Sequence, residues 1–129
     1  MLLIVLALAT SAFADPPPSA FDGRCFYPPG LGDPVPLEVR TTCDRVATGP
    51  QGVDFLETAW DARMLSFSGR WEEDRLVVET VTERSGRSYE ARGLCRIYRA
   101  DQKVSVIACT AVQGARSWIG NFRVSGIDG

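Results

Sequence analysis

Apolar and polar residues alternate along two neighbouring stretches of the chain, residues 87–98 and 103–110. A short polar segment at residues 99–102 separates them, which is the pattern of a β-hairpin. Because side chains on a strand point alternately to its two faces, one set of the first stretch should face a core and the other should face water. The expected inward set is Tyr89, Ala91, Gly93, Cys95 and Ile97. The expected outward set is Ser88, Glu90, Arg92, Leu94, Arg96 and Tyr98.

The second stretch of the hairpin divides less cleanly between apolar and polar positions. The two alternating sets are Val104, Val106 and Ala108 against Lys103, Ser105, Ile107 and Cys109. Since both sets contain apolar residues, we expect this strand to be covered on both faces.

Further strands are predicted on either side of the hairpin. Residues 65–71, 75–83 and 116–125 alternate in the same way and are separated by polar or glycine-containing turns. Residues 37–46 predict an earlier strand, followed by a turn at 48–52, and a short strand is expected around 24–27. The sequence therefore predicts a mainly β fold, a small antiparallel sandwich or barrel built as a meander of about six to eight strands, with at most one short helix.

Residues 54–64 carry the only helical pattern. Asp54 and Glu57 have the spacing of a capping box, and Leu56, Trp60 and Met64 recur every fourth residue. This pattern predicts one short helix, with an irregular connection as the alternative. The tryptophans are expected in the core: Trp60, Trp71 and Trp118.

The first 14 residues are apolar and end in an Ala-x-Ala pattern, which is typical of a secretory signal peptide. Such a run is too short to cross a hydrocarbon core, which needs roughly 20 residues. We expect a signal peptide at 1–14, a proline-rich leader at 15–22 and a single disulfide-stabilised β domain at 23–127. The predicted location is secreted, with the bacterial periplasm favoured and no stable membrane anchor after cleavage; a retained anchor is the alternative.

The chain has four cysteines, Cys25, Cys43, Cys95 and Cys109, an even number that indicates two disulfides in an exported protein. Pairs Cys25–Cys43 and Cys95–Cys109 are favoured because their members are close in sequence. A two-residue turn that pairs residues 99 and 102 would put Cys95 opposite Val106, on the wrong face for Cys109. Either the hairpin is irregular near residue 100, or Cys43 takes one of these two partners. Without histidine or a Cys-x-x-Cys pair, no metal site and no cofactor are expected.

The charges of the chain exclude several functions. Lys and Arg together number 14 against 16 Asp and Glu, so nucleic acid is not an expected partner. The absence of histidine removes the most common general base and the histidine-activated nucleophiles. We therefore predict that the protein is not an enzyme. The acidic turn at residues 72–74 is the densest carboxylate cluster, and a carboxylate-dependent envelope hydrolase is a third hypothesis.

The leading hypothesis is an exported binding domain that recognises a protein or an envelope component through an arginine-rich sheet face. Arginine and aromatic residues interleaved with aliphatic ones are typical of binding patches. The candidate binding residues are Arg87, Arg92, Leu94, Arg96, Tyr98 and Arg123. The alternative is that Glu79, Glu83 and Glu90 neutralise these arginines across strands. The sequence leaves the identity of the partner and the oligomeric state open.

A short string, Ser85-Gly86-Arg87-Ser88-Tyr89, resembles the Ser-Gly-x-x-Tyr loop of bacterial periplasmic C-type lysozyme inhibitors, which are small disulfide-bearing β-barrels. The aromatic-Lys-Gly segment of that family is missing, and Leu94-Cys95-Arg96 stands nearby instead. The resemblance implies an alternative function, a periplasmic inhibitor of a hydrolase such as lysozyme. The inhibitory turn would present Ser85, Gly86 and Tyr89.

An internal similarity links two strand starts. Residues 86–89 and 114–118 both place Arg-Ser-aromatic after a glycine turn. Similar turn chemistry before similar strands explains this similarity, and a binding surface repeated twice is the alternative.

Overall fold

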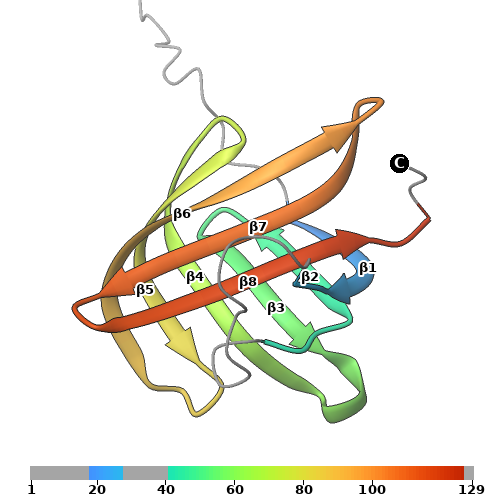
Figure 1. Cartoon of the computed structure of the whole chain (residues 1–129). Coiled ribbons are helices and arrows are strands. Elements are labelled where there is room, and N and C mark those ends of the chain that lie inside the picture. The colour runs from blue at the N-terminus through green and yellow to red at the C-terminus, as the bar shows by residue number, and fades with distance from the viewer. Residues whose placement is uncertain (1–17, 28–40, 127–129) are drawn as a thin grey trace, which may run out of the picture.

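The computed structural model describes residues 18–27 and 41–126, and in these residues eight antiparallel strands close into one barrel (Figure 1). Each strand pairs with the next in the chain, and the first pairs with the last. The strands are β1 (Ser19–Cys25), β2 (Arg45–Gly49), β3 (Gly52–Glu57), β4 (Ala62–Glu72), β5 (Arg75–Glu83), β6 (Ser88–Ala100), β7 (Lys103–Gln113) and β8 (Arg116–Val124). The predicted β class is confirmed, and of the two predicted architectures the barrel is present.

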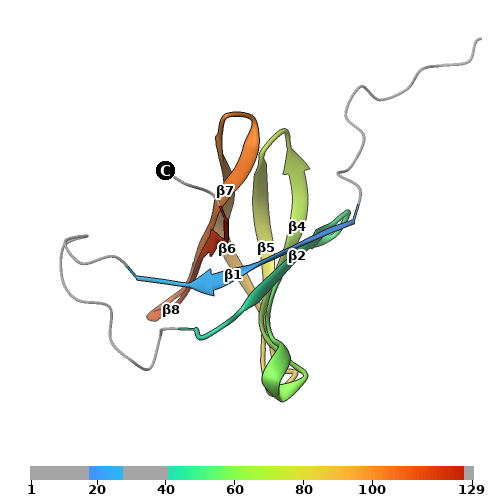
Figure 2. The same ribbon diagram turned by 90° about the vertical axis from the view of Figure 1, so that its right-hand side faces the viewer.

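β1 closes the barrel by dividing its pairing between two neighbours. Its first half, from Ser19 to Asp22, pairs with β2, and its second half, from Gly23 to Cys25, pairs with β8. Figure 2 shows β1 beside β2 and reaching β8. The strand thus begins inside the segment predicted as a leader. The signal-peptide prediction for 1–14 lies outside the described residues.

The core lies inside the barrel and is filled by the inward side chains of the strands, as expected for a barrel of eight strands. On β6, Ala91 and Cys95 are buried with Tyr89 and Ile97 packed against them, which confirms the inward set predicted there. The largest fully buried side chains are Phe55, Phe67, Phe122, Leu76 and Ile107. Phe55 and Phe67 meet edge to face, with 5.9 Å between their ring centroids.

The β6–β7 hairpin differs from the predicted register. Its turn consists of Asp101 and Gln102, both with positive φ, and the pairing shifts by one residue between Tyr98 and Arg99. The bulge changes which residues of β7 point inward, so that Val104 and Ile107 both pack against the core. The prediction that β7 is covered on both faces was therefore wrong, because a change of phase produced the mixed pattern.

The helix predicted at 54–64 is absent. β3 runs through Glu57, a single 3-10 turn occupies Thr58–Trp60, and β4 begins at Ala62. Val53 and Phe55 are fully buried, so the burial follows the period of two of a strand rather than the spacing of four. Trp60 lies on the turn and is 54% exposed, which corrects its assignment to the core.

The strand predicted at 37–46 starts later than expected. Residues 37–40 lie outside the described residues, residues 41–44 are irregular, and β2 occupies Arg45–Gly49. The backbone of Cys43 is still held to β1, because its carbonyl accepts a hydrogen bond of 2.9 Å from the amide of Cys25. The turn predicted at 48–52 contains only residues 50 and 51.

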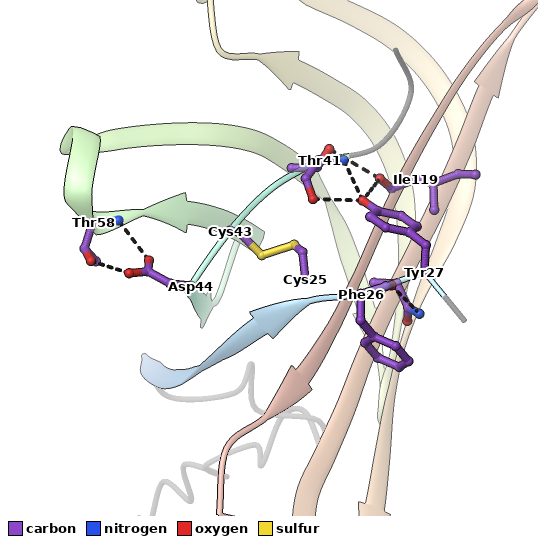
Figure 3. The surroundings of a disulfide bond; sticks show 9 residues. Cys25, Phe26, Tyr27, Thr41, Cys43, Asp44, Thr58 and Ile119 are labelled. Atoms are coloured by element: carbon purple, nitrogen blue, oxygen red, sulfur yellow. Dashed lines mark hydrogen bonds between the residues drawn. A yellow bond between two sulfur atoms is a disulfide. The ribbon is translucent and has the colours of Figure 1, made fainter. Parts of the chain in front are cut away.

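Two disulfides hold the barrel, and they are the favoured pairs. Cys25 bonds to Cys43 (Figure 3), and Cys95 bonds to Cys109. Near the first disulfide, the backbone amide of Thr41 donates to the Tyr27 hydroxyl at 2.6 Å. These contacts fasten the irregular residues 41–44 to the end of β1. The described residues contain no helix of the length and apolarity that a bilayer crossing requires.

Candidate functional site

The outer side of β6 carries most of the binding residues predicted from the sequence. Arg92 and Arg96 are exposed, Leu94 between them is half-buried, and Tyr98 is 48% exposed. They point away from the core because alternate residues of the strand point into it. The parity of the strand therefore brings these four side chains to one surface.

Two neighbouring strands extend this surface. The row that starts at Leu94 crosses β7 at Thr110 and reaches Ile119 on β8, and the row that starts at Tyr98 reaches Arg123. Figure 1 shows the three strands side by side. We name this surface the β6–β8 face. Its residues are Arg92, Leu94, Arg96, Tyr98, Val106, Thr110, Val112, Ile119 and Arg123.

An open groove of about 930 Å³ borders one end of the β6–β8 face. Its lining includes Arg92 and Val112, and on the β4–β5 side Arg70 and Glu79. The backbones approach closely here, because a Cβ atom on Gly93 would lie 1.8 Å from the carbonyl oxygen of Thr110. The groove therefore offers both charge and an exposed valine, since Val112 is 53% exposed.

Two of the three glutamates expected to neutralise these arginines have other partners. Glu79 pairs with Arg70 on β4 at 3.5 Å, and Glu83 accepts a hydrogen bond from the Trp118 indole at 2.9 Å. Within residues 18–27 and 41–126, Arg92 and Arg96 form no ion pair. The β6–β8 face thus keeps guanidinium groups that are open to a partner.

Three other arginines make side-chain contacts of their own; Arg87 and Arg123 were predicted with this face, and Arg99 lies near the end of β6. The guanidinium of Arg99 donates two hydrogen bonds, of 3.1 and 3.2 Å, to the carboxylate of Asp74, and these bonds raise the pKa of Arg99. Arg123 stacks over the ring of Phe26 at 5.3 Å. Arg87 lies at the β5–β6 turn, where it contacts Tyr89 rather than the β6–β8 face.

The acidic turn between β4 and β5 has the features of a solvated ion network. Glu72 pairs with Arg70 at 3.6 Å and with Arg75 at 3.3 Å, and Asp74 is held by Arg99. All three acidic residues of the turn are exposed. In the described part of the chain, no group of three or more His, Cys, Asp and Glu side chains has the arrangement of a metal site.

The turn with the Ser-Gly-x-x-Tyr string joins β5 to β6. Ser85 and Gly86 are exposed at its tip, and Gly86 has a φ of 95°, which favours glycine. Two backbone hydrogen bonds of 2.8 Å close the turn: the amide of Glu83 donates to the carbonyl of Arg87, and the amide of Gly86 donates to the carbonyl of Glu83. Tyr89 is half-buried, so the tip of the turn presents Ser85 and Gly86 but not the tyrosine ring.

Sequence reasoning missed two exposed residues at this end of the barrel. Trp60 projects from the β3–β4 turn, with the guanidinium of Arg84 stacked 5.1 Å from its ring centroid. Arg116 lies 4.8 Å from the ring centroid of Tyr89. The internal similarity was the signal for Arg116, because the two similar segments supply Tyr89 and Trp118, whose rings lie 5.2 Å apart.

Comparison with protein-family models, curated proteins and solved structures finds no match to this chain.

Proposed function

We propose that the protein is a non-catalytic binding protein that recognises an acidic protein or envelope component on its β6–β8 face. The observation that carries this proposal is the row on β6, where two arginines without ion pairs in the described residues flank half-buried Leu94. Exposed cationic and apolar groups in one patch suit a partner that offers carboxylates around an apolar centre.

The stability that the fold loses by keeping Arg96 without an ion pair supports the proposal. Arg75 and Arg96 are direct partners across β5 and β6, and like charges opposite each other on a sheet destabilise the fold. The charge of Arg75 is compensated by an ion pair with Glu72, whereas Arg96 has no ion pair within the described residues. An acidic partner that docks on this face would remove the repulsion.

The two disulfides are compatible with a location outside the reducing cytoplasm, in an extracellular or periplasmic space. The predicted signal peptide extends this to export, and we propose the bacterial periplasm. The partner is therefore to be sought among exported proteins and cell-envelope components.

A pair of charge reversals tests the proposed face. The wild-type protein is used to capture partners from envelope extracts, and the captured partners are identified and purified. Each partner is then titrated against the wild type and against the double variant Arg92→Glu/Arg96→Glu. We expect binding at least about tenfold weaker in the variant, since two charge-assisted contacts become repulsive.

The matched control is Arg45→Glu. Arg45 is an exposed arginine on β2, four strands away from β6 around the barrel. The Arg45→Glu variant should bind the partner with the affinity of the wild type. Unchanged affinity in the Arg92/Arg96 variant would remove the β6–β8 face from consideration.

A second candidate is inhibition of an exported hydrolase such as lysozyme. The small disulfide-bonded barrel and the exposed tip at Ser85 and Gly86 favour it, because they agree with what the Ser-Gly-x-x-Tyr resemblance implies. Purified protein is assayed against lysozyme, with Ser85→Ala and Tyr89→Ala as variants. Inhibition that is lost in Ser85→Ala supports this candidate, and no inhibition by micromolar protein rejects it.

A further inference from the structure

Two aromatic rings pack against each other, tilted by 38°, near the β5–β6 turn. Tyr89 on β6 and Trp118 on β8 lie 5.2 Å apart, and Trp118 is only 7% exposed. The indole N–H of Trp118 donates to the carboxylate of Glu83 at 2.9 Å. The hydrogen bond holds Trp118, and the packing of Trp118 against Tyr89 positions the tyrosine. The Tyr89 hydroxyl faces two exposed arginines, Arg87 beside the β5–β6 turn and Arg116 at the start of β8.

Two guanidinium groups converge on that hydroxyl. Nη1 of Arg87 lies 3.5 Å and Nη1 of Arg116 lies 3.1 Å from the Tyr89 oxygen. Arg116 also covers the face of the tyrosine ring, 4.8 Å from its centroid. Both arginines are exposed, and neither forms an ion pair with any other residue that the structure describes.

This arrangement of donors is suited to bind an anion. Two guanidinium groups are gathered around one hydroxyl oxygen, and the nearby Glu83 carboxylate accepts the hydrogen bond of Trp118. Each guanidinium has five N–H donors, and the phenol keeps its own proton to donate. A carboxylate, with two oxygens and about four lone pairs, would accept from all three groups.

We propose that Arg87, Arg116 and the hydroxyl of Tyr89 form a receptor for a carboxylate carried by an acidic segment of a protein partner. The residues around the receptor favour a protein over a phosphate-bearing ligand or a lipid surface. Trp60, 54% exposed under Arg84, adds the Trp, Tyr and Arg composition of interface hot spots. Glu83, the last residue of β5, and Asp61, in the β3–β4 turn, lie at the same end and would oppose a densely anionic surface.

This receptor shares no residue with the β6–β8 face, and its test does not depend on either function proposed above. The full chain is labelled with ¹⁵N and titrated with the peptide acetyl-Asp-Asp-Glu-Glu-amide while the arginine Nε–Hε signals are followed. We expect the signals of Arg87 and Arg116 to shift. The variant Arg116→Gln should bind the peptide at least about tenfold more weakly than the wild type, because it loses a charge-assisted contact.

Three variants and three alternative ligands decide the outcome. Arg45→Gln should bind as the wild type does, and tryptophan fluorescence, to which buried Trp118 contributes, reports whether each variant is folded. Tyr89→Phe keeps the ring and removes the hydroxyl, so it should weaken binding without unfolding the protein. Equal binding by Arg87→Gln/Arg116→Gln, or by the neutral peptide acetyl-Asn-Asn-Gln-Gln-amide, overturns the receptor. Tighter binding of inorganic phosphate or of phosphatidylglycerol vesicles overturns its assignment to a protein carboxylate.

Discussion

Cys95 on β6 and Cys109 on β7 lie directly opposite each other, with 3.9 Å between their Cα atoms, and both are fully buried. Their bond closes a short segment of chain, 14 residues apart in sequence. Because such a cross-link restricts the unfolded chain, we expect Cys95→Ala/Cys109→Ala to lower the free energy of unfolding by about 3 kcal/mol. Denaturation with urea measures the change. A loss below about 1 kcal/mol would contradict this role.

The same pair shows where sequence reasoning succeeded and where it failed. Proximity in sequence favoured the correct cysteine partners, but the predicted turn at residues 99–102 put Cys95 opposite Val106. The turn actually lies at Asp101 and Gln102, and a bulge adds one more residue of offset. The bulge shows in the sequence only as the mixed alternation of β7, which does not identify the extra residue, so the register of β7 could not be predicted from its residues alone.

Gly93 provides a test of the close approach between β6 and β7. A Cβ atom there would lie 1.8 Å from the carbonyl oxygen of Thr110, and a backbone atom cannot move aside as a side chain can. We expect Gly93→Ala to destabilise the barrel by about 1–3 kcal/mol in chemical denaturation. Gly49→Ala is the control, since nothing lies within 4 Å of its added Cβ, and it should stay within about 0.5 kcal/mol of the wild type. Equal stability of both variants would be inconsistent with a tight contact at Gly93.

Trp60 allows the corrected reading of residues 54–64 to be checked. Since the ring is 54% exposed, Trp60→Ala should cost less than about 1 kcal/mol of stability. Phe55 is fully buried against Phe67, and Phe55→Ala should cost about 3–5 kcal/mol. The reverse order of the two losses in urea denaturation would restore the helix predicted for this segment.

The helix was predicted because Leu56, Trp60 and Met64 happen to recur every fourth residue, whereas Val53 and Phe55 bury themselves with a period of two. The strands at 75–83 and 116–124 could be predicted because one face of each is buried and the other is in contact with solvent. The candidate face on β6 followed from that parity. The contact of Arg116 with Tyr89 could not be predicted in this way, because it depends on the pairing register of β6 with β7 and of β7 with β8.

Asp44 gives the fold a predictable response to acid. Its carboxylate accepts hydrogen bonds from the hydroxyl of Thr58 and, at 2.8 Å, from the backbone amide of the same residue (Figure 3). These bonds lower the pKa of Asp44 from its usual value of 3.8. A carboxyl group with a lowered pKa in the folded state stabilises the fold at every pH above its unfolded value. That contribution is lost as the pH falls through the folded pKa.

We therefore expect Asp44→Asn to be less stable than the wild type at neutral pH, and the difference to shrink below pH 3.8 and vanish once the folded protein is also protonated. Urea denaturation at a series of pH values measures this difference. Thr58→Ala removes the hydroxyl donor and keeps the backbone donor, so it should reproduce part of the effect. A gap between Asp44→Asn and the wild type that stays constant from neutral to acidic pH would show that the ionised carboxylate is not what joins Asp44 to the β3–β4 turn.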